Sequence, residues 1–405
     1  MYFTQDRQFK ILLFFGTLLP FSLITGPAIT ELSIVVLSIS FFFLLDIKSL
    51  NKILKNKYII IFFTFYFILI LSSLFSDNIL YCLKKTIPYF RYLLFSLSIF
   101  LILKNHKRFL NYFFISLCFA NILLLLGSFY EVLTNSNILG AQKIFENRVS
   151  SFFGDEYIMG SYSARLLPLL SVVYLMYEKK NKKINILFFL GFVSAVINTI
   201  LSGERTAFVY MLFFITPFSI CFFTKSLFKK VFGIFTLLCI FTILIISNPG
   251  LKKRYIDLTL AQFKSEKSII FSEEHTQVYN TAYKIFLDHP IIGAGPNTYR
   301  LLYNDKKYYS GKHSKNTHPH NTYLQILSEV GLIGIVIPLI LLVILSCKFF
   351  AEIFLNKNSN LIRISFYASF LISLFPFIPS GNFFNNYLSI VYYLPFGFYL
   401  YYKNI

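Results

Sequence analysis

The feature of this sequence that most constrains its fold is a series of apolar runs, each close to the length that crosses a lipid bilayer. A transmembrane helix needs about 20 mostly apolar residues, because a helix satisfies its own backbone hydrogen bonds where no water is present. The chain of 405 residues is 56% hydrophobic and only 14% charged, which is too apolar for a soluble domain of this length. The runs lie at residues 9–25, 29–45, 58–75, 88–103, 109–130, 157–177, 184–201, 207–223, 231–247, 331–347, 364–380 and 387–402. They predict an all-α integral membrane protein with about 12 transmembrane helices, in a single polytopic domain over residues 1–405.

The basic residues divide unevenly between alternate loops, and this division predicts an orientation. When alternate short loops are taken together from the N-terminus, one set carries 20 Lys and Arg residues and the other set carries 5. Positive charge is retained on the cytoplasmic side, so both termini are predicted to be cytoplasmic. Residues 248–320, between spans nine and ten, form a segment too long for this rule, and alternation assigns it to the outer face. Topology accounts for most of the net charge of +20, so nucleic-acid binding is not expected.

The long outer segment is predicted to contain an amphipathic helix. Five of the six histidines lie in this segment: His275, His289, His313, His318 and His320. Ser272 is a suitable N-cap, and Glu273 and Glu274 would occupy the first turn, where the helix dipole favours acidic residues. Apolar residues then recur at helical spacing until Pro290, so we expect a helix that lies on the membrane and a tight turn at GAGPN, residues 293–297.

Polar residues also occur where apolar runs begin or end. A helix after His320 would place a polar stripe, Asn321, Gln325, Ser328 and Glu329, on one face, which predicts a cavity or a partner helix beside it. Glu329 is expected to make a helix–helix contact. Four arginines in or beside spans are functional candidates, since a guanidinium is costly in a bilayer: Arg91, Arg148, Arg165 and Arg205. For Arg91 and Arg165 an interhelical hydrogen-bond role is equally open.

The stretch HPHNTYLQILSEVGLIG, residues 318–334, resembles a motif of bacterial O-antigen ligases of the WaaL type. In that pattern a histidine and an Asn, Ser or Gln are followed, after nine residues, by a glycine and then, three positions further on, by a Gly, Thr or Tyr. Here these positions are His320, Asn321, Gly331 and Gly334. The long loop, DHPIIGAGPN within it and the S-x-x-R-like turn LSGER extend the resemblance over about residues 140–340. The motif is less specific to ligases than to their superfamily, which includes polysaccharide polymerases, and it implies a GT-C-like fold.

The resemblance implies a membrane glycosyltransferase that moves a glycan from undecaprenyl pyrophosphate to a hydroxyl of lipid A core. The family works in the periplasm without a metal, a nucleotide sugar or another cofactor, so the inner membrane is the expected location. His320 matches the essential histidine of the family, and Arg205 matches its arginine after span seven. Asn321 and His318 flank that histidine and are candidate substrate contacts.

One position departs from the family pattern. A further family arginine usually precedes the P-x-x-G turn, and His275 stands at that place here. The second contact to the diphosphate is therefore open between His275 itself and three arginines, Arg148, Arg254 and Arg300.

The chemistry of these side chains fits the implied reaction. Arg pairs with phosphate through two parallel N–H groups and stays charged, so it can stabilise a departing lipid diphosphate in place of a divalent ion. A hydroxyl that attacks the anomeric carbon must lose its proton, and an imidazole is suited to accept it at neutral pH. We expect a single displacement with inversion. His320 as the base is our interpretation, and a role in orienting the acceptor is the alternative.

A metal site is not predicted. His318 and His320 would offer two ligands, with His313 or His275 as a third, but no carboxylate or cysteine is suitably spaced. The five cysteines lie in or beside apolar runs and predict neither a disulfide framework nor a cysteine metal cluster.

Three other functions compete with the ligase. A polymerase that joins repeat units uses the same lipid-linked donor and differs in its acceptor. Protein O-oligosaccharyltransferases usually extend beyond the last span and are ranked lower. A twelve-span transporter is the rival from another class, but transporters often show internal repeats and polar sites near the midplane. Here no repeat is visible, and the polar residues gather at one surface.

Overall fold

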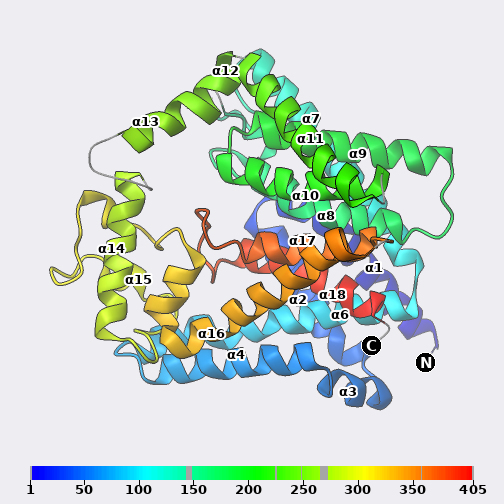
Figure 1. The fold of residues 1–405 in the computed structure, drawn as a ribbon. Helices are drawn as coiled ribbons and strands as arrows, with labels where there is room; N and C mark the ends of the chain where they lie inside the picture. Colours follow the sequence, from blue (N-terminus) through cyan, green and yellow to red (C-terminus); the bar gives the residue numbers. More distant parts are fainter. Residues whose placement is uncertain are drawn as a thin grey trace. The chain divides into compact units, whose positions relative to one another are not determined.

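The computed structural model describes residues 2–142, 148–223, 226–247, 249–264, 272–356 and 358–403. Within these ranges the regular structure is helical, apart from one isolated β-bridge between Ser136 and Gln142 (Figure 1). Seven helical stretches are long and apolar enough to cross a membrane: Pro27–Leu44, Lys57–Leu74, Ile79–Asn105, Arg108–Thr134, Lys182–Leu201, Arg205–Phe222 and Thr322–Leu355. Shorter apolar helices occur at Phe9–Thr25 and Leu361–Ser373. The chain is a multi-pass membrane protein.

Each predicted span overlaps a helix, although the number of spans that cross the membrane stays a prediction. The helices are α1 (Tyr2–Thr25), α2 (Pro27–Leu44), α4 (Lys57–Leu74), α6 (Arg91–Asn105), α7 (Arg108–Thr134), α8 (Met159–Leu175), α9 (Lys182–Leu201), α10 (Arg205–Phe223), α11 (Leu227–Ser247), α16 (Thr322–Phe350), α17 (Leu361–Ser373) and α18 (Asn386–Tyr402). The expected run 364–380 is too long, because α17 ends at Ser373. Pro376 and Pro379 follow, and proline cannot continue a helix.

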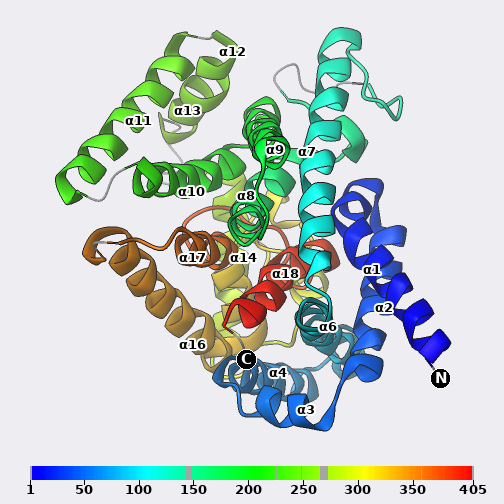
Figure 2. The ribbon, with the colours of Figure 1, turned by 90° about the vertical axis from the view of Figure 1, so that its right-hand side faces the viewer.

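The chain forms two compact units, and the first comprises residues 1–37, 99–259 and 345–373. In this unit α7 packs along α1 and α9, while α8 packs against α9, α10 and α17 (Figure 2). Small residues allow these close approaches. A Cβ at Gly191 would lie 2.9 Å from the Sγ atom of Cys118, and a Cβ at Gly160 would collide with the side chain of Ser202. Short elements complete the unit: η2 (Ser151–Phe153), α12 (Pro249–Lys252), the π-helix η3 (Lys253–Asp257) and η5 (Ala351–Leu355).

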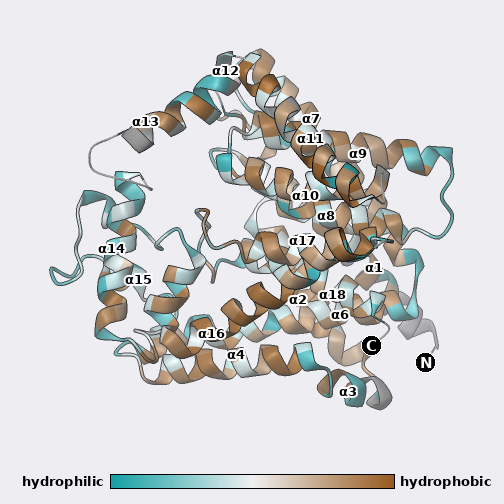
Figure 3. Ribbon diagram, in the orientation of Figure 1, coloured by the Kyte–Doolittle hydropathy of each residue, from teal (hydrophilic) through white to brown (hydrophobic). Residues whose placement is uncertain are grey.

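The second unit comprises residues 38–98, 260–344 and 374–405. It contains α3 (Ile47–Leu54), α5 (Ile79–Thr86), η1 (Ile87–Phe90), α14 (Glu273–Asp288), α15 (Tyr299–Leu302) and η4 (Lys312–Ser314), besides α4 and α18. The unit boundaries fall within four further helices, α2, α6, α13 (Leu258–Lys264) and α16. Hydrophobic residues follow the lengths of α4 and α16, whereas hydrophilic residues gather at α3 and in the loops around α14 (Figure 3).

The helix predicted in the outer segment is confirmed as α14. The Ser272 side chain accepts a hydrogen bond from the backbone N–H of His275, and the helix ends at Asp288, before Pro290. The expectation that the apolar face of α14 contacts the membrane is wrong, because that face packs against other residues of the loop. Val278, Ala282 and Ile285 are buried in a small core together with Ala294, Tyr299 and Tyr308. The aromatic residues of the loop itself therefore cover this face.

A break in α16 joins this loop to the helix that follows the histidine motif. Gly331 has φ 74° and ψ −169°, which a residue with a Cβ rarely adopts, and a Cβ there would collide with the carbonyl of Ile291. The break lets the GAGPN turn bond to the helix backbone. The N–H groups of Ala294 and Gly295 donate to the carbonyls of Ser328 and Glu329 at 3.0 and 2.9 Å. The predicted turn is confirmed. The motif glycine Gly331 is required because the break in α16 needs a positive φ and leaves no space for a Cβ.

The polar stripe of α16 faces this turn and the 380–383 loop, rather than a cavity or a partner helix. Glu329 accepts the backbone N–H groups of Asn297 at 2.9 Å and Tyr299 at 3.0 Å. Gln325 donates to Glu329 at 3.1 Å and to Asn382 at 2.8 Å. The expected helix–helix contact of Glu329 is thus replaced by a contact with a turn, whose N–H groups otherwise would be buried without acceptors.

Candidate active site

The second unit brings three histidines together at the start of α16. The ring centroids of His318 and His320 are 4.2 Å apart, and those of His275 and His320 are 5.8 Å apart. His275 reaches the group from the first turn of α14, where its Nδ1 lies 2.6 Å from the hydroxyl of the capping Ser272. The capped helix and the loop before α16 therefore position the cluster.

His320 has an unusual backbone. Its φ of 51° lies in the left-handed region, which costs free energy for a residue with a Cβ. Its carbonyl accepts the N–H of Ser380 at 2.8 Å, and the hydroxyls of Ser380 and Thr322 are also 2.8 Å apart. These bonds hold the strained residue in place and fix where its ring points.

The polar partners of the rings indicate that His320 is neutral. Its Nε2 lies 2.8 Å from Nδ2 of Asn316, an amide nitrogen that only donates, so Nε2 acts as the acceptor. Nδ1 of His318 lies 2.9 Å from the hydroxyl of Thr317. Its Nε2 is buried and has no hydrogen-bond partner among the described residues.

Burial sets the protonation of the cluster. Burial, and next the neighbouring ring of His275, lowers the pKa of His320 to about 4. Burial, and next the ring of His320, lowers the pKa of His318 to about 3. The pKa of His275 is also lowered by burial. At neutral pH the cluster therefore presents uncharged imidazoles, and His320 can accept a proton.

Asn321 and Arg300 lie around this cluster. The Asn321 side chain caps α16, because its Oδ1 accepts the N–H groups of Tyr323 and Leu324 at 3.0 Å, while its Nδ2 donates to the carbonyl of Pro376 at 2.9 Å. Arg300 projects from α15, and its Nε is buried without a partner among the described residues. Its charge is close enough to depress the pKa of His318 further, after burial and the ring of His320.

The first unit brings together three arginines at the turn before α10. Arg148 donates to the carbonyls of Tyr157 at 3.1 Å and Ser202 at 3.4 Å, and its guanidinium lies 4.6 Å from the centre of the Tyr157 ring. Arg254, on the π-helix η3, donates to the carbonyl of Gly203 at 2.8 Å. Arg205 opens α10 next to this turn, within electrostatic range of both other guanidinium groups. Three cations thus converge, which is a suitable arrangement for a diphosphate.

Glu204 is the acidic residue of this turn, and it faces α8. Its Oε1 accepts the N–H groups of Gly160 at 2.8 Å and Ser161 at 3.2 Å, the orphan donors at the start of that helix. Burial raises the pKa of Glu204 to about 7, against the lowering effects of these bonds and of Arg148. Glu204 therefore anchors the turn that presents Arg205.

The two arginines predicted within spans make helix contacts. Arg165 is buried on α8, where it donates to the hydroxyls of Ser161 at 3.1 Å and Tyr210 at 3.3 Å and to the carbonyl of Ile372 on α17 at 3.4 Å. Arg91 donates to Asn386 of α18 at 3.0 Å, within the second unit. These bonds are of the interhelical kind that the sequence left open for both residues.

The structure separates the predicted residues into two groups. The histidine group of the second unit contains His275, His318, His320, Asn321 and Arg300. The arginine group of the first unit contains Arg148 and Arg205 with Arg254. Sequence reasoning gave no role to Glu204 or Asn316. The partners of Glu204, Gly160 and Ser161, lie far along the chain, and Asn316 contacts His320 within an irregular loop. Among the described residues, no three side chains of His, Cys, Asp or Glu are grouped so as to hold a metal ion.

Comparison with known families decides which class these groups belong to. Residues 190–339 match the family model described as O-Antigen ligase. This segment is an O-antigen ligase family domain. Ligases and polymerases share the domain, so the chain is a membrane enzyme of the glycosyltransferase type that acts on lipid-linked glycans. No curated protein matches the chain significantly.

The O-antigen ligase family domain contains the whole histidine group and two of the three residues of the arginine group. It runs from α9 into α16, so it includes Arg205 and Arg254 of the arginine group and all three clustered histidines. Arg148 and Arg165 precede it. The contacts of Arg148 with the turn at Ser202 show how a residue outside the matched segment joins one inside it.

Proposed function

We propose that this protein is an O-antigen ligase, which transfers a glycan from undecaprenyl pyrophosphate to a hydroxyl of lipid A core. The observation that carries the proposal is the neutral, half-buried ring of His320, whose Nε2 accepts a hydrogen bond from Asn316. An acceptor hydroxyl that replaces the amide of Asn316 donates its proton to the same nitrogen. His320 then acts as the general base.

The reaction is a single displacement at the anomeric carbon. The hydroxyl oxygen of the acceptor forms the new bond to this carbon, while its proton passes to Nε2 of His320. The bond from the carbon to the diphosphate oxygen breaks, and the electron pair leaves with the lipid diphosphate. Arg205, Arg148 and Arg254 stabilise the charge that develops on the leaving group. Inversion at the anomeric carbon follows from the single displacement.

His275, His318, Asn321 and Arg300 are proposed to contact substrate around the base. The buried Nε2 of His318 and the buried Nε of Arg300 supply unused hydrogen-bonding capacity for sugar hydroxyls. Arg165 and Arg91 are proposed to position helices, with substrate contact as the alternative. We propose a metal-independent reaction, in which the guanidinium groups stabilise the negative charge of the leaving group in place of a divalent metal ion.

The proposal includes a topology. We propose twelve spans in a single polytopic domain, with both termini in the cytoplasm and the loop 248–320 in the periplasm. The histidine group then lies on the periplasmic side of the inner membrane. The asymmetry of 20 to 5 basic residues between the two sets of short loops supports this orientation.

The experiment that tests the function is done in the native host. The gene is deleted and replaced with the wild type or with His320→Asn, and both lipopolysaccharide and lipid-linked glycan are analysed. Bare lipid A core with long chains left on undecaprenyl pyrophosphate is the result expected of a ligase. Core that carries a single repeat unit instead identifies a polymerase. If the deletion strain and the His320→Asn strain both show the lipopolysaccharide pattern of the wild type, both functions are rejected.

A further inference from the structure

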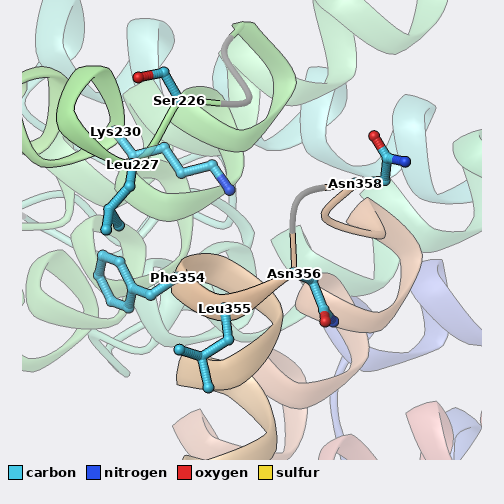
Figure 4. Close-up of a pocket in the computed structure, with 7 residues that line it drawn as sticks. All are labelled: Ser226, Leu227, Lys230, Phe354, Leu355, Asn356 and Asn358. Carbon is cyan, nitrogen blue, oxygen red and sulfur yellow. The ribbon is translucent and has the colours of Figure 1, made fainter.

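A pocket lies in the first unit at the connections between helices, outside the residues discussed above. It has a volume of about 620 Å³ and lies where α11 begins and where η5 leads toward α17 (Figure 4). Its polar lining includes Ser226, Lys230, Asn356 and Asn358, and its apolar lining includes Leu227 and Leu355. The sequence-based topology assigns both connections to the cytoplasmic side.

Among the described residues that line the pocket, Lys230 is the charged one. The residue is only 2% exposed, and its Nζ donates to the carbonyl of Ile353 at 2.6 Å and to the hydroxyl of Ser359 at 2.5 Å. Its side chain also forms a hydrogen bond with Cys221. A buried ammonium normally requires a counter-charge. Among the residues that the structure describes, none forms an ion pair with Lys230.

The nearby acidic residue is engaged elsewhere. Glu352 is 4% exposed, accepts the N–H of Asn360 at 2.7 Å and lies 3.6 Å from the guanidinium of Arg363. The first turn of α11 adds to the positive potential, because Lys230 is the fourth residue of that helix and the N-terminal N–H groups carry partial positive charge. The pocket is thus prepared for an anion.

The rim of the pocket is apolar and exposed. Leu227 is 54% exposed and Leu355 is 78% exposed, and Phe228 beside them is 80% exposed. Such side chains at the ends of membrane-length helices suit contact with lipid chains. An anion with an attached hydrocarbon chain satisfies the lysine and the rim together, which a free anion does not. The cytoplasmic leaflet is rich in anionic lipids of this form.

We propose that this pocket binds the phosphate of an anionic phospholipid headgroup. Lys230 supplies the charge that contacts the phosphate oxygens, Asn356 and Asn358 line the same pocket, and the acyl chains lie against Leu227 and Leu355. The site is independent of the glycan-transfer chemistry, since it uses none of the residues of the histidine or arginine groups.

The test measures lipid binding to the purified full-length protein in detergent by native mass spectrometry. Phosphatidylglycerol is the anionic probe, phosphatidylcholine is the zwitterionic probe, and inorganic phosphate is the soluble probe. Lys230→Gln keeps the ability to donate hydrogen bonds and removes the charge, so it should weaken phosphatidylglycerol binding about tenfold. Lys229→Gln, at an exposed neighbouring lysine of the same helix, is the matched control and should bind like the wild type.

A second variant guards against loss of folding. Asn358→Asp changes an exposed residue, leaves the bonds of Lys230 intact and places a carboxylate at the pocket, so it should also weaken phosphatidylglycerol binding. If both variants bind phosphatidylglycerol as the wild type does, the proposal is overturned. It is also overturned if phosphatidylcholine binds equally well. If inorganic phosphate competes as strongly as phosphatidylglycerol, the ligand is a soluble phosphate compound and the lipid assignment is wrong.

Discussion

The histidine group and the arginine group differ in charge: the first holds neutral imidazoles and the second holds charged guanidinium groups. Around His320 the protein holds half-buried imidazoles beside one another, and the rings of His318 and His320 stay neutral because their pKa values fall to about 3 and 4. Around Arg205 it gathers three guanidinium groups that cannot lose their charge and holds two of them with backbone carbonyls. The one acid of the turn, Glu204, accepts backbone N–H groups at the start of α8 and also interacts electrostatically with Arg148. We propose that one group accepts a proton and that the other holds an anion.

The largest effect on the transfer rate is expected when the proposed base, His320, is replaced. His320→Asn keeps a residue type that tolerates the left-handed backbone and removes the ring nitrogen, so the transfer rate should fall about 10³-fold. The rate is measured with purified enzyme and lipid-linked donor, alongside the melting temperature. His289→Asn, at the C-terminal end of α14, is the control and should keep wild-type activity. Wild-type activity in the His320 variant would exclude the base assignment.

The arginine group is tested by keeping its charge and changing its shape. Arg205→Lys retains the cation and loses the planar pair of donors, so we expect the rate to fall about 10²-fold. Arg108→Lys, at an exposed position at the start of α7, serves as the control. If Arg205→Lys turns over like the wild type, a point charge is sufficient and bidentate pairing is not needed.

The pH profile sharpens the contrast between neutral and charged groups. An unperturbed imidazole of pKa 6.5 is mostly protonated at pH 5, which would reduce kcat/KM about 30-fold. Because the pKa of His320 is lowered to about 4, the enzyme should keep most of this activity at pH 5. His275→Asn removes a neighbouring ring and should move the acid limb toward higher pH. An acid limb near 6.5 in the wild type would contradict the buried, neutral cluster.

The smallest expected effect concerns the anchor of the arginine turn. The pKa of Glu204 is raised from 4.5 to about 7, so the folded protein holds a proton that the unfolded chain releases between these values. Its contribution to stability is therefore full below pH 4.5 and is lost as the pH rises through 7. Glu204→Gln should flatten the fall in melting temperature over this range. A parallel slope in variant and wild type would show that other groups dominate.

The sequence predicted those parts of the site that local rules govern. Ser272, two acidic residues and Pro290 define α14 within one stretch of chain, and the glycines of 293–297 define the turn. The histidine motif likewise lies within one continuous stretch, residues 318–334. Helix propensity, capping and turn chemistry act over such short distances, so a sequence alone contains them.

The carboxylates were beyond sequence reasoning. Four buried or half-buried glutamates each accept backbone N–H groups of a turn or helix start far along the chain or across a loop: Glu131, Glu204, Glu329 and Glu352. The partners of Glu131, for example, are Ser150 and Ser151. A backbone donor has no sequence signature, so nothing marks which acid will serve which turn. The gathering of Arg254 with Arg148 depends on the same long-range packing.

The break at Gly331 also bears on the depth at which the proposed base would lie relative to the hydrocarbon core of the membrane. The helix after the break, residues 332–350, rises about 28 Å, which matches a hydrocarbon thickness of about 30 Å. The nine residues before it add up to about 14 Å on the side of His320. We therefore expect proton transfer at the depth of lipid headgroups and the water above them. Acceptor sugars that project from the leaflet would reach the base without entering the membrane interior.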